Sequence, residues 1–281
     1  MTTSSSGTPS LAGIRGPIVL VGVGKMGGAM LEGWLSLGLD PKSVIAFEPQ
    51  PTPELKALEK RGLRLNPVAA AAGADAAALV LAVKPQAAAG VVIGLKLFAG
   101  SGTVVLSIMA GTTLQFLERE FVFSSVVRAM PNTPAAIGRG MTVAVPSKKV
   151  TPPQRQLVDA LLSATGAVEW IDNESFMDAV TAVSGSGPAY VFLLAESLAR
   201  AGAAAGLPAD LSERLARATV AGAGELLHRS TEEAATLRKN VTSPGGTTAA
   251  ALDVLMADDG MDPLMKRAIA AATKRSKDLG S

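Results

Sequence analysis

The chain has 281 residues, enough for two domains, with a formal net charge of +2 at pH 7 and no cysteine. The lack of cysteine excludes disulfides, thiolate metal sites and cysteine nucleophiles, and the dispersed Lys and Arg argue against nucleic acid as the main partner. Apolar runs are broken by Gly, Pro or charge, the longest (Ala69–Val83) containing Gly73 and Asp75, so we expect no membrane-spanning segment.

The first segment, residues 1–15, is rich in Ser and Thr and lacks the basic start and apolar stretch of a signal peptide. We expect a disordered tail there. Together with the absence of cysteine, this composition favours a cytoplasmic protein.

Residues 16–172 alternate short β-rich runs with helical stretches. Helices are expected at about Met26–Leu37 and Pro53–Arg61, and Ala87–Phe98 is compatible with a helix. This alternation predicts an α/β domain with a mainly parallel sheet covered on both faces. The expected strands are Pro17–Val21, Val44–Phe47, Ala78–Val83, Thr103–Ile108, Ser125–Arg128, Met141–Val145 and Val168–Ile171.

Residues 173–281 change character, because no convincing strand follows Ile171 and helices dominate. Asp210 and Asp262 are expected as helix caps, with Pro263 at a first helical position. Ala and Gly crowd these helices, which suits a tightly interwoven helical domain or dimer interface, although helix propensity alone also explains the alanines. The expected helices are Glu174–Val183, Pro188–Gly206, Asp210–His228, Thr231–Asn240, Thr247–Ala257 and Pro263–Lys277.

The first predicted strand runs into a G-x-G-x-x-G turn and then into a helix. Gly22 permits the tight turn, Gly24 lets the backbone approach a pyrophosphate, and Gly27 allows close packing of helix and strand, with Lys25 and Met26 between them. The helix start offers free N–H groups to phosphates. This predicts a Rossmann-like, doubly wound domain that binds NADH or NADPH; a purely structural turn is the alternative.

Glu48 ends the second predicted strand, about twenty residues beyond Gly27. A carboxylate there accepts hydrogen bonds from the ribose hydroxyls and repels a 2′-phosphate, and Pro49–Pro53 contains no Arg or Lys to hold that phosphate. The position therefore favours NADH over NADPH. A solvated Glu beside a proline-rich loop is the alternative.

The acids that usually accompany reduction of a carbonyl are missing. Tyr190 is followed four residues later by Leu194 instead of Lys, and His228, the only histidine, lies near a predicted helix end beside Arg229. Catalytic zinc would lack its usual Cys and His ligands, and we expect no metal. A cyclic iminium ion already carries its proton, so it fits by elimination as the substrate.

Five further motifs lie at Ala82–Gln86, Ser107–Gly111, Arg128–Pro134, Val183–Tyr190 and Val241–Thr248. They resemble motifs of the pyrroline-5-carboxylate reductase family and occur in that family's order. With the glycine turn they cover the chain from about Pro17 to its end. The resemblance implies a Rossmann domain followed by an α-helical dimerisation domain, and NAD(P)H-dependent reduction of 1-pyrroline-5-carboxylate to L-proline, the final step of proline biosynthesis. It also implies a homodimer or an assembly of dimers.

The last motif implies the substrate site. Its Pro-Gly-Gly bend leads into a helix whose N–H groups can seat a carboxylate. By resemblance Thr248 is the catalytic residue, which hydrogen-bonds the ring nitrogen and orients or protonates the imine. A plain helix cap is the alternative. The implied substrate-binding residues are Ser243, Gly245, Gly246, Thr247 and Thr248.

The remaining motifs imply the rest of the cofactor site at the carboxyl edge of the sheet. Lys84 is placed near cofactor phosphate or ribose, or else is a solvated strand-end lysine. Asn132 orients either the nicotinamide carboxamide or its own loop, and Ser184–Pro188 either touches substrate or only packs closely. The implied cofactor residues are Ala82, Val83, Lys84, Pro85, Ala110, Met130 and Asn132.

Two other functions stay open at this stage. Another imine or β-hydroxyacid reductase could share the architecture, although the stretch Ser186–Leu194 lacks the lysine of the β-hydroxyacid type. A non-catalytic nucleotide-binding regulator would be expected to have lost the threonine loop, which is intact here.

Overall fold

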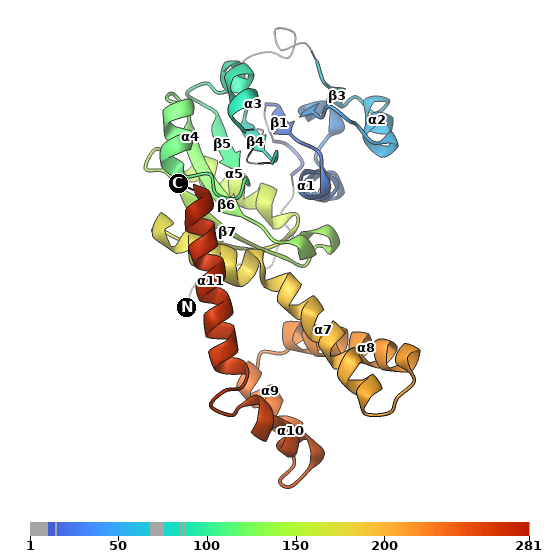
Figure 1. Ribbon diagram of the computed structural model, residues 1–281. Helices are drawn as coiled ribbons and strands as arrows, with labels where there is room; N and C mark the ends of the chain where they lie inside the picture. Colours follow the sequence, from blue (N-terminus) through green and yellow to red (C-terminus); the bar gives the residue numbers. More distant parts are fainter. Residues whose placement is uncertain (1–10, 15, 68–75, 85, 87, 281) are drawn as a thin grey trace. The chain divides into compact units, whose positions relative to one another are not determined.

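The computed structural model describes residues 11–14, 16–67, 76–84, 86 and 88–280. By its internal contacts the chain divides into two compact units. The first comprises the chain up to Gly185 together with Lys274–Ser281, and the second is Ser186–Thr273. Each unit is described by itself below (Figure 1).

The first unit is built on an eight-stranded sheet in the order β3-β2-β1-β4-β5-β6-β7-β8. All neighbours pair in parallel except β6 and β7, so the mainly parallel sheet expected from the sequence is confirmed. The two-residue β3 was not predicted. The strands are β1 (Ile18–Val21), β2 (Val44–Phe47), β3 (Arg64–Leu65), β4 (Ala78–Leu81), β5 (Val104–Ser107), β6 (Ser125–Met130), β7 (Gly140–Pro146) and β8 (Gly166–Trp170).

Helices cover both faces of this sheet (Figure 1). They are α1 (Lys25–Ser36), α2 (Pro53–Glu59), α3 (Ala88–Leu95), α4 (Leu114–Glu120) and α5 (Pro152–Ser163), with short 3₁₀ turns η1 (Pro41–Ser43), η4 (Lys96–Phe98), η5 (Thr133–Ile137) and η6 (Glu174–Phe176).

The two faces follow from alternation of side chains along the strands. In β1, Ile18 and Leu20 join an apolar cluster with α1, α2 and α5, whereas Val19 and Val21 join a second cluster with α3 and α4. The indole N–H of Trp34, fully buried on α1, donates a 2.8 Å hydrogen bond to the backbone oxygen of Leu161 on α5. The sheet is therefore sandwiched as the strand–helix alternation predicts.

The strand order reverses between β1 and β4, and this places the ligand edge of the sheet. In open α/β sheets, ligands bind outside the carboxyl ends of the strands at such a switch point. The glycine turn follows β1, and Ala82–Lys84 follow β4. Two motifs separated by about sixty positions in the sequence therefore meet at one edge.

The expected tail ends earlier than residue 15. Residues 1–10 and Arg15 lie outside the described residues, but Leu11 is only 1% exposed and its N–H donates to the backbone oxygen of Leu37. Its side chain packs in the cluster that contains Trp34. The expectation was wrong at Leu11 because one leucine in a Ser/Thr-rich stretch gives no periodic signal.

The second unit is helical. After η6 and α6 (Met177–Val180) a π-helical turn, η7 (Thr181–Gly185), closes the first unit, so the single helix expected over Glu174–Val183 is divided into three pieces. No strand follows β8 among the described residues, as expected. The helices that follow are α7 (Gly187–Ala204), α8 (Ala209–Arg229), α9 (Ala234–Asn240), α10 (Thr247–Leu255) and α11 (Met261–Gly280).

The helix starts differ from three expectations, and Pro263 lies at the third instead of the first position of α11. Asp210 and Asp262 are not caps, because α8 begins at Ala209 and α11 at Met261, which puts both acids in first turns. There their negative charge still suits the positive end of the helix. Each also pairs with a cation one turn later, Asp210 with Arg214 at 2.8 Å and Asp262 with Lys266 at 2.7 Å.

The boundary between the units differs from the expected division at residues 172 and 173. The first unit extends to Gly185, since Met177 is buried against Val143 and Val145 of β7. The last residues of α11 also return to it, where the Ser276 hydroxyl donates to the Asp178 carboxylate at 2.7 Å. In the described part of the chain, no helix combines the length and apolar character needed to cross a membrane.

Candidate active site

The glycine turn after β1 is sterically specified at two of its three glycines. Gly22 has a φ of +90°, and a Cβ there would lie 2.7 Å from the backbone oxygen of Ala82 at the end of β4. A Cβ on Gly27 would collide with the backbone oxygen of Gly22. Gly24 differs, because a Cβ on it would meet no atom within 4 Å. The open space at Gly24 fits close approach of a dinucleotide pyrophosphate.

The start of α1 is prepared for an anion. Gly24 is its N-cap, no side chain caps the helix, and its first turn contains no acidic residue. The first hydrogen bond of the helix runs from Gly28 N–H to the Gly24 oxygen at 2.7 Å. The N–H groups of the first turn that come before Gly28 therefore have no acceptor within the helix. With Lys25 exposed at this positive helix end, the local charge favours phosphate.

Glu48 follows β2 and turns back to the glycine turn. Its Oε2 accepts a 2.8 Å hydrogen bond from the N–H of Val23, and its Oε1 accepts one of 3.0 Å from the N–H of Gln50. The half-buried carboxylate is thus held by two backbone donors beside the turn, where the ribose-binding acid of a dinucleotide domain is expected.

A cavity of about 230 Å³ lies at the carboxyl edge of the sheet. Ile108 and Met109 were not predicted as site residues, although both lie within the motif Ser107–Gly111. Met109 is nearly fully buried and lines the cavity at the end of β5. Pro85 lies outside the described residues. The cavity brings together six of the expected cofactor residues with three more, namely Met26, Ala82, Val83, Lys84, Ala110 and Met130 with Ile108, Met109 and Pro131.

Asn132 uses both ends of its carboxamide within the protein. Its Oδ1 accepts from the N–H of Met141 on β7 at 2.9 Å, and its Nδ2 donates to the backbone oxygen of Ser184 at 3.3 Å. Ser184 lies in the π turn, and a Cβ on its neighbour Gly185 would collide with the Met130 methyl group. Of the two roles considered for Asn132, these contacts match orientation of its own loop.

A larger cavity of about 690 Å³ lies between α1 and α2 and reaches the turn at Val23 and Gly24. Its leucine-rich wall carries Lys25 and Arg61 but also Glu32 and Glu54. The backbone hydrogen bond of Glu54 at the start of α2, and then the Thr52 hydroxyl, lower the pKa of Glu54, which keeps it anionic at neutral pH. The two positive charges are therefore balanced by the two negative ones, and the cavity has no net positive charge with which to bind a 2′-phosphate.

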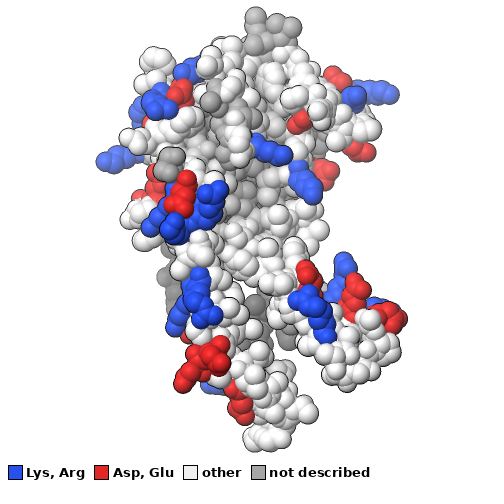
Figure 2. All heavy atoms as spheres, viewed as in Figure 1, with Lys and Arg blue, Asp and Glu red and all other residues white. Residues whose placement is uncertain are grey.

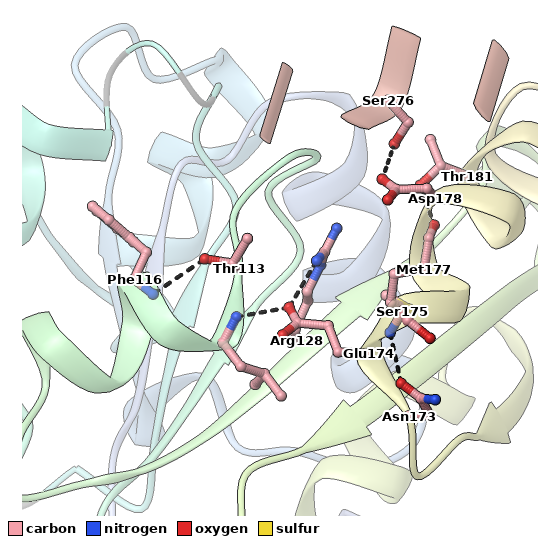
Figure 3. A network of polar contacts seen from close by, with 11 residues as sticks. Thr113, Phe116, Arg128, Asn173, Glu174, Ser175, Met177, Asp178, Thr181 and Ser276 are labelled. Carbon is pink, nitrogen blue, oxygen red and sulfur yellow. Dashed lines mark hydrogen bonds and ion pairs between the residues drawn. The ribbon is translucent and has the colours of Figure 1, made fainter. Parts of the chain in front are cut away.

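A polar network joins β6, the start of α4 and η6 (Figure 3). Arg128 on β6 donates from Nη1 to Oε1 of Glu174 at 2.7 Å, and the same oxygen accepts the N–H of Leu114 at the start of α4 at 2.7 Å. Thr113 caps α4 by accepting from the N–H of Phe116. Glu174 thus ties together the segments that follow β5 and the strand that ends at Met130.

The expected substrate loop lies in the helical unit. Gly245 has a φ of +68°, and Gly246 donates to the Ser243 backbone oxygen at 3.0 Å, which closes a tight turn before α10. Gly246 is the N-cap of α10 and no side chain caps the helix. The side-chain helix cap, which was the alternative considered from the sequence, is therefore not formed. Thr248 is half-buried in the first turn of α10.

No group of three or more His, Asp or Glu side chains suited to a metal ion occurs among the residues that the structure describes. His228 lies in the last turn of α8, at the helix end expected from the sequence. The tyrosine at position 190 lies on α7.

Fold and site define a nicotinamide-dinucleotide oxidoreductase, in which a G-x-G-x-x-G turn and an acid after β2 meet at the switch point of a doubly wound sheet. Comparison with known families agrees. Residues 17–111 match the family described as NADP oxidoreductase coenzyme F420-dependent, and residues 174–279 match that described as pyrroline-5-carboxylate reductase dimerisation.

Individual relatives identify the family. A pyrroline-5-carboxylate reductase of Synechocystis sp. is 41% identical over 242 residues, which are 85% of this chain and 89% of that protein. A solved pyrroline-5-carboxylate reductase of Coxiella burnetii is 32% identical with a TM-score of 0.86, covering 95% of this chain and 99% of that one. A pyrroline carboxylate reductase of Plasmodium falciparum, solved with NADP bound, is 30% identical with a TM-score of 0.78, covering 94% and 98%. The chain belongs to the pyrroline-5-carboxylate reductase family.

Proposed function

We propose that the protein reduces the C=N bond of 1-pyrroline-5-carboxylate with NADH or NADPH and so forms L-proline. The observation that carries the proposal is the open N-terminus of α10, whose Pro-Gly-Gly turn leaves the first N–H groups of the helix without a side-chain cap. A carboxylate on a small ring fits such a seat. The relatives named for this reaction match the chain over most of its length.

The cofactor residues have roles that follow from their positions. Gly24 and the start of α1 would hold the pyrophosphate, and Glu48 would accept the ribose hydroxyls. Met26, Ala82, Ala110 and Met130 would line the nicotinamide side of the smaller cavity. A bound reduced nicotinamide supplies a hydride from C4.

We propose a preference for NADH. The Glu48 carboxylate repels a 2′-phosphate, and the neighbouring larger cavity balances Lys25 and Arg61 with Glu32 and Glu54. The relative from Plasmodium falciparum was solved with NADP bound, so membership of the family does not by itself imply NADH. The proposed preference rests on the residues of this chain's own ribose site. Comparison of kcat/KM for the two cofactors tests it.

Thr248 orients the substrate. The protonated imine carries a proton on nitrogen, and the Thr248 hydroxyl oxygen accepts a hydrogen bond from that N–H while the helix N-terminus holds the carboxylate. Addition of a hydride to the imine carbon would turn the C=N electron pair into the nitrogen lone pair, and the amine would take a proton from water. Thr248 need not donate a proton, so alignment supplies most of the catalysis.

We propose that the protein works as a homodimer through its helical unit. Only Ser212 and Ala216 are buried among residues 186–273, whereas Phe192, Leu193 and Val254 are 62%, 55% and 72% exposed. Figure 2 shows uncharged surface over parts of α7, α8 and α10. A helical unit with so little core of its own needs a partner surface, and the family match of this segment is a dimerisation domain.

The direct test is a spectrophotometric assay. Purified protein mixed with 1-pyrroline-5-carboxylate should oxidise NADH or NADPH, and L-proline should accumulate in equal amount. Oxidation of neither cofactor would refute the proposed reaction. A 2-hydroxy acid and a β-hydroxyacid, assayed in the reverse direction with the oxidised cofactors, serve as controls for the other reductase types that share this architecture.

A further inference from the structure

Asn66 holds the backbone of Glu48 from both sides. Its Oδ1 accepts the Glu48 N–H at 2.8 Å, and its Nδ2 donates to the Glu48 carbonyl oxygen at 2.8 Å. A side-chain amide that pairs with both backbone groups of one residue imitates a neighbouring strand. Asn66 itself is exposed and lines neither of the two cavities described above.

This pairing extends β3, which is too short to reach Glu48 with its own backbone. β3 consists of Arg64 and Leu65, and its ladder with β2 ends where Leu65 pairs with Ala46. The N–H of Asn66 still donates to the Ala46 oxygen at 2.8 Å. Beyond that point the carboxamide replaces the missing strand and extends the support to Glu48.

The backbone of Asn66 is unusual in a way that serves this geometry. Its φ is +45°, and it is the only residue other than glycine with a positive φ among those the structure describes. Asn tolerates this left-handed conformation better than most residues. Strained backbone of this kind clusters at functional sites, where the surroundings hold it in place.

The support reaches the cofactor site through the carboxylate. While Asn66 fixes the Glu48 backbone, Glu48 Oε2 accepts the Val23 N–H at 2.8 Å in the glycine turn. The N–H of Gly22 donates to the Phe47 oxygen at 2.8 Å, so the turn and the end of β2 are joined twice. A displacement of the Glu48 backbone therefore moves the carboxylate relative to the turn.

We propose that Asn66 is a positioning residue that sets the discrimination between NADH and NADPH by holding Glu48. The inference rests on the ribose-binding role given to Glu48 in the proposed function. A carboxylate discriminates a 2′-hydroxyl from a 2′-phosphate only if its oxygens are held at hydrogen-bonding distance. Loss of the Asn66 carboxamide lets the Glu48 backbone shift and displace the carboxylate, which then depends on the Val23 and Gln50 N–H groups alone. This displacement weakens the ribose contact and relieves the repulsion.

The test measures the Kd of NADH and of NADPH by calorimetry, without substrate, in the full-length protein. Asn66→Gly keeps the positive φ and removes the carboxamide, and Asn66→Asp keeps the acceptor for the Glu48 N–H but loses the donor. We expect the Kd for NADH to rise about five- to tenfold in Asn66→Gly, and less in Asn66→Asp. The Kd for NADPH should stay constant or fall.

Gln154→Ala is the matched control. This half-buried side chain also bonds two backbone groups through its carboxamide, accepting from Thr151 N–H at 3.0 Å and donating to the Gly102 oxygen at 3.3 Å, and it lines neither cavity described above. It should leave both Kd values unchanged. Thermal unfolding of each variant separates a loss of stability from a change in cofactor preference.

A double-mutant cycle identifies the route of the effect. If Asn66 acts through Glu48, Asn66→Gly should not alter the ratio of the two Kd values in a Glu48→Ala background. An unchanged ratio in the single variant, or an equal change in both backgrounds, would overturn the inference. Because binding is measured without pyrroline-5-carboxylate, the two Kd values can be interpreted even if the protein does not catalyse the proposed reaction.

Discussion

The guanidinium of Arg128 and the carboxylate of Glu174, 46 positions apart in the sequence, meet at 2.7 Å. The Arg128 side chain is only 8% exposed and that of Glu174 is 29% exposed. The shared oxygen also accepts from Leu114 N–H, so one carboxylate holds a strand and a helix start (Figure 3). Charges largely withdrawn from water depend on their partners, since Arg128 alone would be buried without compensation and Glu174 alone would be only partly solvated.

Arg128→Met should therefore lower the free energy of unfolding by about 2–4 kcal/mol, measured by urea denaturation. Glu174→Gln keeps an acceptor for Leu114 but leaves Arg128 without its counter-charge, and should cost a similar amount. The double variant should lose less than the sum of the two. Arg214→Met, which breaks the exposed pair with Asp210, is the control and should change stability little. Additive losses would show that the pair is not coupled.

Gly24→Ala should separate cofactor binding from folding. The φ of Gly24 is −73°, and a Cβ there meets no protein atom within 4 Å, so thermal stability should hardly change. The added methyl group would enter the space assigned to the pyrophosphate, and the Kd for the dinucleotide should rise at least about tenfold. Calorimetry of the variant measures this rise, and unchanged affinity would place the pyrophosphate elsewhere. Gly27→Ala is the contrasting variant, which should destabilise the fold because its Cβ collides with the Gly22 oxygen.

The sequence predicts the regular part of this fold well, because its signals are local. The buried strand Val44–Phe47 was predicted to the residue, and the glycine turn and the helix after it were recognised from spacing alone. β3 was missed, since two residues carry no periodicity. The π turn at Thr181–Gly185 was also missed, because a widened turn keeps the apolar pattern of an ordinary helix.

The candidate site was predicted by its motifs but not by its contacts. Met26, Ala82 and Ala110 come from three separate motifs and line one cavity. No motif spacing predicts that Asn66 pairs with Glu48, or that Arg128 pairs with Glu174. Such pairs depend on strand order and register, which are set by packing of the whole sheet rather than by neighbours in the chain.

Thr248→Val should lower kcat without changing cofactor affinity. The valine keeps the shape of the side chain but removes the hydroxyl that would orient the imine nitrogen. A loss of about tenfold to a hundredfold in kcat is expected if one hydrogen bond aligns the substrate. Steady-state kinetics and dinucleotide calorimetry measure the two quantities separately. Thr242→Val, which removes a hydroxyl bonded to the Arg238 backbone oxygen, is the control; an equal effect of both variants would contradict the role of Thr248.

Phe192→Glu should dissociate the assembly. Phe192 is 62% exposed on α7 of the helical unit, and a carboxylate there would be buried without a partner at an apolar interface. Light scattering should show a monomer, with activity lost in parallel. Phe123→Glu is the matched control, since Phe123 is 80% exposed in the first unit, outside the proposed interface. A dimer that persists in Phe192→Glu, or dissociates in Phe123→Glu, would move the interface away from α7.

The most direct test of the proposed reaction follows the hydride. NADH carrying deuterium at the transferred C4 position should convert 1-pyrroline-5-carboxylate to L-proline labelled on Cδ, the former imine carbon, and unlabelled on Cα. Nuclear magnetic resonance of the product reads both positions. Label on Cδ is the result that we predict for hydride transfer to this imine. Label on Cα, or cofactor oxidation without labelled proline, would contradict it.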